Sequence, residues 1–399
     1  VVLALTPVVE RFACRRGWLD RPGGRHQHTR AVPRLGGVAL FAGLVAGCGV
    51  LWAAGLGQSV APALAGASVV WLVGLWDDLR GLRPAAKLAG QVAAALVSVA
   101  LGLRVEFVTA PHLWKSAPAE VLHLGWSSYP LTVLWLVSLS NAVNLLDGLD
   151  GLAAGGVAIA AVPTAVAALG RGFVEAAALL AVLGAGCLAF LRYNFHPARI
   201  FMGDSGALLL GFTFGAAAVA GTAKGPAAMT LLVPVLSLGV PLLDTAWAVV
   251  RRLRAGRSVA EADAGHLHHR LLNGGRRQVW QVVLLLYAVT AALGAIAAAL
   301  PPRGRLGSGM ALSLLGTACV LAVLMRASGR PAVADASAGS GGSAGSTSGQ
   351  APASGGGVGP VAGKVDGRLG SSGHAGVRHP AGGYQARPGH PHPGGFSRL

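Results

Sequence analysis

NAVNLLDGLDG, residues 141–151, closes a long apolar run with two asparagines and two aspartates. Residues 129–146 are otherwise apolar enough to form a membrane helix, where unpaired carboxylates are costly. Asparagine does join membrane helices, but two amides and two carboxylates within ten residues exceed what packing requires. The stretch therefore predicts a membrane helix that ends in a turn kept for chemistry.

Three further polar segments have the same character. They read WDDLRGLRPAAKLAGQ at residues 76–91, RYNFHPARIFMGDSG at 192–206 and AGHLHHRLL at 264–272. Each of them adjoins the end of an apolar segment. We therefore expect the fold to bring these ends together with the turn that closes residues 141–151.

The composition indicates the class of protein. The chain is 53% hydrophobic and 12% charged, with mean hydropathy +0.59, and a spanning helix needs about 20 mostly apolar residues. This predicts a polytopic integral membrane protein. The formal charge of +17 does not indicate nucleic-acid binding, because the basic residues lie in short loops where they set orientation. The four cysteines are scattered, without the spacing of a metal site.

Ten apolar runs predict membrane helices, and residues 1–10 look like the end of an eleventh whose beginning is missing. Residues 11–34 form a basic loop that ends in VPRLGG. Residues 104–128 alternate in polarity, which predicts a short hairpin or flap outside the bilayer. The ten runs cover 38–56, 60–76, 85–103, 129–146, 152–169, 173–191, 206–222, 228–250, 279–300 and 307–325.

Loop charges predict the orientation of this all-α fold of ten to eleven helices. With residues 11–34 in the cytoplasm, the inside loops hold 19 Lys and Arg and the outside loops hold 6, as the positive-inside rule requires. All four polar segments then face the cytoplasm. Residues 1–326 form the transmembrane domain. Residues 327–399 contain 20 of the 60 glycines and few large side chains, so we expect a disordered cytoplasmic tail.

The aspartates of the polar segments are candidates for chemistry. Asp77 and Asp78 end a helix, where the macrodipole disfavours a carboxylate, and the alternative is a solvated interfacial pair. Asp204 begins a helix, so a cap is its local alternative. With Asp147 and Asp150 they form a hard-oxygen set. Such a set suits Mg²⁺, or Mn²⁺ in its place, shared with substrate phosphates.

The histidine segment adds positive charge. If HLHHRL is helical, His266, His269 and Arg270 share one cationic face, with His268 next to them in the chain. A cationic face suits a diphosphate. The alternative is a basic loop that touches lipid headgroups, but this accounts poorly for three clustered histidines.

Taken in order, VPRLGG, DDLRGL with KLAGQ, NAVNLLDGLDG, PARIFMGDSG and HLHHRL resemble the motifs of the polyprenyl-phosphate N-acetylhexosamine-1-phosphate transferases, the membrane family that includes MraY, WecA and TagO. The likeness runs from Thr6 to about Arg326. It implies transfer of a sugar-1-phosphate from a UDP-sugar to a polyprenyl phosphate, with Mg²⁺ and release of UMP. The form HLHHRLL is similar to the branch that uses UDP-N-acetylglucosamine.

The resemblance also implies residue roles. Asp204, Asp147 and Asn144 would bind Mg²⁺, and Asp77 would deprotonate or orient the lipid phosphate, whether the reaction is direct or passes through a covalent intermediate. The implied catalytic residues are Asp77, Asp78, Asp204, His266, His268 and His269. The implied substrate-binding residues are Lys87, Asn141, Asn144, Asp147, Gly148, Leu149, Asp150, Asn194, Phe201 and Arg270. Four of these would border the uridine: Gly148, Leu149, Asp150 and Phe201.

The expected partners are the two substrates and the lipids of a bacterial plasma membrane, with a homodimer as an open alternative. Two other functions compete. A muramoyl-pentapeptide transferase of peptidoglycan synthesis shares the motifs, although that branch usually carries a different histidine-rich segment. A cation-coupled transporter also uses intramembrane carboxylates, but near the midplane rather than at helix ends. A CDP-alcohol phosphotransferase is disfavoured, because DGLDGLAAGG lacks the arginine of its signature.

Overall fold

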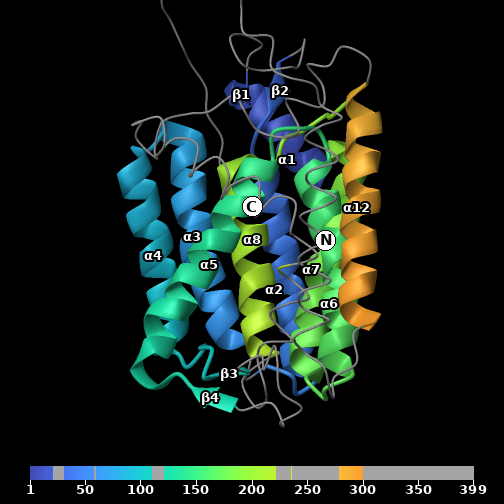
Figure 1. Ribbon diagram of the computed structural model, residues 1–399. Helices are drawn as coiled ribbons and strands as arrows, with labels where there is room; N and C mark the ends of the chain where they lie inside the picture. The colour runs from blue at the N-terminus through green and yellow to red at the C-terminus, as the bar shows by residue number, and fades with distance from the viewer. Residues whose placement is uncertain (21–30, 58–59, 110–120, 222–234, 236–277, 300–399) are drawn as a thin grey trace, which may run out of the picture. The chain divides into compact units, whose positions relative to one another are not determined.

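A computed structural model describes residues 1–20, 31–57, 60–109, 121–221, 235 and 278–299 of the chain. The chain divides into two units, Val1–Val333 and Ala334–Leu399, and the described residues all belong to the first, which is mostly helical (Figure 1). Several predictions fall outside the described residues. These are the helix at 228–250 apart from residue 235, the histidine segment at 264–272, the helix at 307–325 and the tail at 327–399.

Helices account for most of the described chain. They are α1 (Val2–Arg16), α2 (Gly36–Ala53), α3 (Ala61–Arg80), α4 (Pro84–Ala100), α5 (Ser128–Leu146), α6 (Leu152–Leu169), α7 (Val174–Asn194), α8 (Gly203–Ala220) and α12 (Val279–Ala299), with a short 3₁₀ helix, η1 (Gly125–Ser127). The helix expected at the N-terminus is present but longer than predicted. It continues to Arg16, into the stretch assigned to the basic loop, because its apolar positions still face the other helices as far as Ala13.

Two pairs of short antiparallel strands complete the described fold. Strands β3 (Phe107–Thr109) and β4 (Val121–His123) pair with Phe107 opposite His123, which confirms the predicted hairpin. Strands β1 (Leu19–Asp20) and β2 (Val32–Pro33) pair within the stretch expected to be a loop. In Figure 1 these two strand pairs lie at opposite ends of the helices.

α3 and α8 reach beyond their predicted apolar runs at the ends that carry candidate aspartates. α3 continues past the apolar run to Arg80, and Gly81 ends it with φ 71°, a backbone conformation that favours glycine. α8 begins at Gly203, three residues before its predicted start at 206. Asp77, Asp78 and Asp204 therefore lie inside terminal helical turns, where the backbone fixes their directions.

Six described helices are long and apolar enough to cross a membrane: α2, α5 with η1, α6, α7, α8 and α12. Together with the named relatives described below, they make this a multi-pass membrane protein. Of the other predicted spans, α3 includes two aspartates and an arginine at its end, and α4 is a shorter apolar helix. The remaining two fall outside the residues that the structure describes.

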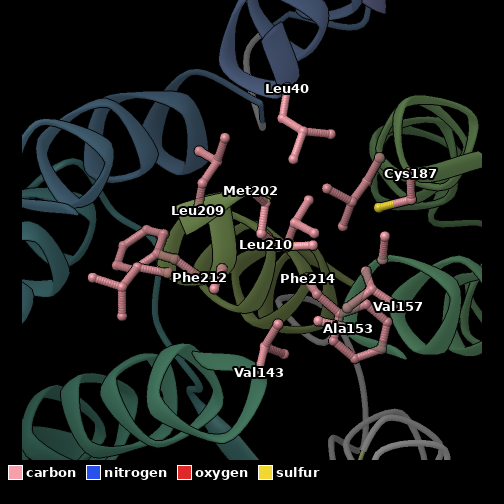
Figure 2. Packing of buried hydrophobic residues seen from close by; sticks show 14 of the residues in the cluster. Leu40, Val143, Ala153, Val157, Cys187, Met202, Leu209, Leu210, Phe212 and Phe214 are labelled. Atoms are coloured by element: carbon pink, nitrogen blue, oxygen red, sulfur yellow. The ribbon is translucent and has the colours of Figure 1, made fainter. Parts of the chain in front are cut away.

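α8 is the central helix of the described bundle. Its candidate span is 83% buried, the largest share among the six, as expected for a helix that is apolar on all sides. Figure 2 shows Leu209, Leu210, Phe212 and Phe214 of α8 surrounded by side chains of neighbouring helices. Those neighbours include Leu40 of α2, Val143 of α5, Val157 of α6 and Cys187 of α7.

Glycines set the close spacing around α8. A Cβ at Gly211 would stand 2.4 Å from the Leu139 carbonyl oxygen of α5, and one at Gly74 would stand 2.5 Å from the Ser205 Cα. Only glycine allows backbones to approach so closely between membrane helices. This packing places the first turn of α8 directly against the last turns of α3.

Candidate active site

Four helix ends meet at one end of the bundle and bring together three of the four polar segments. α3 contributes Asp77 and Asp78 from its last turn, and α4 contributes Lys87 from its first. α5 contributes Asn144 from its last turn, and α8 contributes Asp204 from its first. The predicted convergence is therefore confirmed for these segments, whereas His266, His268, His269 and Arg270 lie outside the described residues.

Lys87 is the centre of a group that we call the Lys87 cluster, formed by Asp77, Lys87, Asn144 and Asp204. The Lys87 ammonium lies 3.1 Å from Asp77 Oδ2 and 3.4 Å from Asn144 Oδ1, and it forms a closer ion pair with Asp204 Oδ2. Asn144 Nδ2 also donates to Asp204 Oδ1 at 2.7 Å. Three oxygens from three helices thus converge on one positive charge.

The Lys87 cluster is partly open to solvent. The exposed fractions of the side chains are 13% for Asp77, 17% for Lys87 and 32% for Asp204. The charged groups are therefore partly exposed to solvent, and water screens the attraction between them only in part. Asp77 and Asp78 are therefore not a solvated interfacial pair, the alternative considered for them from the sequence.

Asp78 points to the start of α8 and not into the Lys87 cluster. Its carboxylate accepts hydrogen bonds from the backbone N–H groups of Asp204 at 2.8 Å and Ser205 at 3.0 Å, and from Ser205 Oγ at 2.6 Å. These N–H groups have no partner within the helix. Asp204 itself does not cap α8, so its carboxylate remains free to contact Lys87 and Asn144.

Asn141 lies one turn before Asn144 on α5 and has a different partner. Its side-chain amide and that of Gln91 on α4 donate to each other's carbonyl oxygens, and Asn141 Nδ2 also donates to the Val137 carbonyl at 2.8 Å. Gln91 is buried. The structure thus gives Asn141 a contact between helices, and its predicted role in substrate binding stays a prediction.

The turn between α5 and α6, residues 147–151, which we call the DG turn, holds two further candidate aspartates. Asp147 is half-buried, and burial together with the nearby charges of Asp204, Asp78 and Asp150 raises the pKa of its carboxyl well above the usual value. No described residue donates a hydrogen bond to this carboxyl. A site with so many carboxylates favours a bound cation.

Asp150 is held by the segment before α8. Its Oδ2 lies 2.8 Å from His196 Nδ1 and accepts a hydrogen bond from the Ala198 backbone N–H at 3.0 Å. Gly151 follows with φ 80° and opens α6, which confirms the predicted turn. The backbone of Ala198 and the ring of His196 were not among the predicted site features, although both lie in the quoted segment 192–206.

The other predicted uridine-site residues have diverse surroundings. Leu149 is buried in the hydrophobic core, Gly148 is exposed, and Phe201 is half-buried with its backbone bonded to Pro33 and Gly36. Asn194 is also buried, and its Nδ2 donates to the Ile200 carbonyl at 3.0 Å. The Asn194 Oδ1 has no hydrogen-bond partner among the described residues.

Tyr287 of α12 is a contact that sequence reasoning missed. Its hydroxyl donates to the Gly151 carbonyl at 2.6 Å, and its ring lies against α6, where a Cβ at Gly155 would stand 1.9 Å from the hydroxyl oxygen. No motif marks Tyr287. The contact joins two helices separated by more than a hundred residues and supports the DG turn from outside the predicted segments.

The donor set of the Lys87 cluster fits a hard cation. Carboxylate and amide oxygens of Asp77, Asp204 and Asn144 already surround one positive charge, and such oxygens are the ligands that Mg²⁺ prefers. Within the described ranges, no three acidic, histidine or cysteine side chains group closely enough to hold a metal. A metal here would therefore need the Asn144 amide and oxygens from a substrate.

Comparison with known proteins identifies one family. The family described as Glycosyl transferase family 4 matches residues 60–222, a range that includes the Lys87 cluster and the DG turn. The histidine segment at 264–272 lies beyond this range.

Named relatives extend the likeness over most of the chain. A probable undecaprenyl-phosphate N-acetylglucosaminyl 1-phosphate transferase of Bacillus subtilis is 39% identical over 286 residues, which cover 71% of this chain and 78% of the relative. A decaprenyl-phosphate N-acetylglucosaminephosphotransferase of Mycolicibacterium smegmatis is 35% identical, with 79% and 83% covered. A phospho-N-acetylmuramoyl-pentapeptide-transferase of Synechococcus is 34% identical over 285 residues, with 67% and 78% covered.

Proposed function

The chain belongs to glycosyl transferase family 4, and on that basis we propose that it transfers N-acetylglucosamine-1-phosphate from UDP-N-acetylglucosamine to a polyprenyl phosphate, with release of UMP. The names of the Bacillus and Mycolicibacterium relatives support the acceptor and the sugar. One observation of the structure carries the proposal. The Lys87 cluster joins carboxylate, amide and ammonium groups at the end of membrane helices.

The reaction brings two anions together, so the site must supply positive charge. A lipid phosphate must approach a sugar diphosphate, and positive groups offset their repulsion and the charge that develops at the transferred phosphorus. Lys87 supplies such a group, and it contacts the phosphates of the substrates. Asp77 lies beside it at 3.1 Å, within reach of an acceptor phosphate that Lys87 holds, and it deprotonates or orients that phosphate.

Mg²⁺ belongs to the same proposal. Asp204 and Asn144, with Asp147 of the DG turn, would hold the ion, and oxygens of the diphosphate would complete its ligands. When bound, Mg²⁺ neutralises charge on the diphosphate and polarises the phosphorus–oxygen bond that breaks. The nearness of the Asp147 carboxyl to the charges of Asp204, Asp78 and Asp150 supports this assignment, since a cation would offset their mutual repulsion. Mn²⁺ replaces Mg²⁺, as hard-oxygen sites accept both ions.

The membrane orientation completes the proposal. The loops predicted on the side of the Lys87 cluster carry the larger number of Lys and Arg, so this side faces the cytoplasm, where UDP-sugars are made. The chain then crosses a bacterial plasma membrane ten or eleven times. The candidate carboxylates lie at helix ends, which fits transfer to a lipid headgroup better than transport of a cation across the midplane.

A transfer assay with two donors tests the function. Membranes that contain the protein are incubated with polyprenyl phosphate and Mg²⁺, and with either labelled UDP-N-acetylglucosamine or labelled UDP-N-acetylmuramoyl-pentapeptide. We expect a labelled lipid from the first donor, formation of UMP, and loss of product when EDTA removes divalent cations. Asp204→Asn, which we expect to lose about 10²-fold in turnover, is the low-activity reference, and Glu106→Gln is the matched control at an exposed ion pair away from the site.

Each result of the assay has a defined meaning. Release of UDP would contradict the proposal, because it would mean transfer of the sugar without its phosphate. Labelled lipid from the pentapeptide donor alone would replace the proposed donor with the one used by the Synechococcus relative. Full activity in EDTA would remove Mg²⁺ from the mechanism and leave the rest of the proposal in place.

A further inference from the structure

Asp77 and Asp78 are neighbours in the sequence but serve different parts of the fold. Asp77 Oδ2 lies 3.1 Å from the Lys87 ammonium, in the partly exposed cluster. The Asp78 carboxylate is directed at the first turn of α8. Two adjacent residues on a helix point about 100° apart, so a pair of aspartates can face two sites at once.

The contacts of Asp78 occupy both of its oxygens. Oδ1 accepts from the Asp204 N–H at 2.8 Å, and Oδ2 accepts from the Ser205 N–H at 3.0 Å and the Ser205 hydroxyl at 2.6 Å. All three donors belong to the first turn of α8. A carboxylate at a helix N-terminus also interacts favourably with the helix dipole. Asp78 is thus a cap supplied to α8 by another helix.

The surroundings of Asp78 leave no room for a side chain at Gly203, the first residue of α8. Gly203 has φ +68°, and a Cβ there would stand 2.5 Å from Asp78 Oδ2 and 2.8 Å from the Arg34 carbonyl oxygen. Arg34 in turn donates from Nη2 to the Asp78 carbonyl at 3.0 Å. The carboxylate therefore lies between the end of α3, the start of α8 and the segment that leads into α2.

The VPRLGG motif braces the same turn. The Phe201 N–H donates to the Pro33 carbonyl at 2.8 Å, and the Gly36 and Gly37 N–H groups donate to the carbonyls of Phe201 and Met202 at 2.9 and 2.8 Å. These bonds align the residues that enter α8. The motif lies more than 160 residues from them in the chain, and it has no other role in the proposed reaction.

We propose that Asp78 is a positioning residue: it caps α8, takes the local capping task from Asp204, and so fixes the Asp204 carboxylate where it meets Lys87 and Asn144. Its own carboxylate neither transfers a proton nor binds the metal. This inference rests on the proposed function, but its first test needs no substrate.

Thermal unfolding of the purified protein in detergent, with EDTA and without substrates, provides that test. In Asp78→Asn one carboxylate oxygen becomes an N–H₂ group that faces N–H donors, so we expect the melting temperature to fall by about 4–10 °C. Ser205→Ala removes the hydroxyl bond alone and should lower it by about 2–4 °C. The double variant should melt close to Asp78→Asn, because the two changes act on the same interaction.

Activity separates positioning from catalysis. If Asp78 only positions Asp204, Asp78→Asn should lose about 10-fold in kcat and need more Mg²⁺ for half-maximal rate, and Ser205→Ala should change both values in the same direction by about 2- to 3-fold. If Asp78 transfers a proton, Asp78→Asn should lose about 10²- to 10⁴-fold, and Ser205→Ala should match the wild type.

The outcome that overturns the inference is therefore specific. It is an Asp78→Asn protein that melts like the wild type and is nearly inactive, next to an unaffected Ser205→Ala protein. If Asp78→Asn does not fold, Ser205→Ala decides, since a wild-type melting temperature and wild-type Mg²⁺ dependence would both contradict the cap. Glu106→Gln controls for the change from acid to amide and should leave both readouts unchanged. A wild-type protein without transferase activity would contradict the proposed function and leave the melting result intact.

Discussion

The Lys87 cluster and the DG turn both present carboxylates at the same end of the bundle, but most of their contacts are of different kinds. In the Lys87 cluster, charged and amide side chains of four helices contact one another, with one added backbone bond from the Leu82 N–H to Asp77 Oδ1 at 2.6 Å. In the DG turn, most contacts run between side chain and backbone: Asp150 accepts from the Ala198 N–H, and the Gly151 carbonyl accepts from Tyr287, while the His196 ring is the one side chain that meets Asp150 among the described residues.

This difference indicates what each region contributes. A cluster of side chains can change partners when a ligand arrives, because its charges are satisfied by groups that can rotate. A turn fixed through its backbone keeps one geometry whether or not a ligand is present. We infer that the charged groups of the Lys87 cluster change partners during the reaction. The DG turn forms a rigid edge of the proposed nucleotide site. Substitutions should then affect catalysis in the Lys87 cluster and at Asp147, the proposed metal ligand of the turn, and binding geometry at the other residues of the DG turn.

The largest effects are expected in the Lys87 cluster. Asp204→Asn removes an anionic ligand of the proposed metal, so turnover should fall about 10²-fold or more and recover in part at high Mg²⁺. Asp77→Asn should reduce turnover by about 10²- to 10⁴-fold, as expected for loss of a general base, with nearly normal Mg²⁺ dependence. Initial rates measured against Mg²⁺ concentration, at matched expression, separate the two variants.

The contrast between these two aspartates is one of degree, because their charges lie close enough to influence each other. Binding of Mn²⁺ to the variants with UDP-N-acetylglucosamine present and the acceptor lipid absent, followed by electron paramagnetic resonance, adds a readout that is independent of turnover. Asp204→Asn should bind Mn²⁺ more weakly than Asp77→Asn does. A wild-type rate and a wild-type metal dependence in Asp204→Asn would remove Asp204 from the metal site.

Much of the Lys87 cluster could be predicted from the sequence. Charges are rare next to membrane helices, so Asp77, Lys87, Asn144 and Asp204 stand out against an apolar background, and the boundaries of α6 were predicted to the residue. The ends of α3 and α8 were harder to predict. α3 and α8 extend beyond their apolar runs because Asp78 on one satisfies the N–H groups of the other, which is a tertiary contact that no local pattern reveals.

The supports of the DG turn could not be predicted in the same way. The stretch that ends in DGLDG predicted a turn. Gly151 has a positive φ, a backbone conformation that favours glycine. The partners of that turn are a backbone N–H at Ala198 and a tyrosine on α12, and neither has a distinctive sequence environment. Backbone donors are present at almost every residue, so only the fold selects the one that is used.

An intermediate effect is expected at Asp150. Asp150→Asn keeps an oxygen for the Ala198 N–H but loses the charge that faces His196, so the edge of the proposed nucleotide site should shift. We expect the KM for UDP-N-acetylglucosamine to rise about 10-fold, in line with loss of one charge-assisted hydrogen bond, with a smaller change in kcat. Steady-state kinetics at saturating polyprenyl phosphate measure both values.

His196→Ala tests whether Asp150 acts through its neighbours. If the DG turn is a rigid edge, this variant should raise the same KM, by about 2- to 5-fold, because Asp150 loses one of its two supports. A catalytic role would show instead as a fall in kcat that equals or exceeds the change in KM. That result would place Asp150 with the Lys87 cluster and end the distinction between the two regions.

The smallest effect is expected at Tyr287, which touches the DG turn only through the Gly151 carbonyl. Tyr287→Phe removes the hydroxyl and leaves the ring against α6. The lost hydrogen bond is worth about 0.5–1.5 kcal/mol, and it acts on the turn rather than on the substrate, so the KM for the nucleotide sugar should rise only about 2-fold. Turnover at saturation should stay close to the wild-type value, since no charge of the Lys87 cluster changes.

Two further variants determine whether this effect belongs to the turn. Gly155→Ala should displace the Tyr287 ring, because the added Cβ would overlap the hydroxyl, and it should raise the same KM. Tyr129→Phe is the matched control: its hydroxyl accepts a hydrogen bond from Arg104 near the β3–β4 hairpin, at the opposite end of α5 from the DG turn. If Tyr287→Phe lowers kcat and leaves KM unchanged, α12 acts on the reacting charges, and the DG turn is not the rigid edge that its backbone contacts indicate.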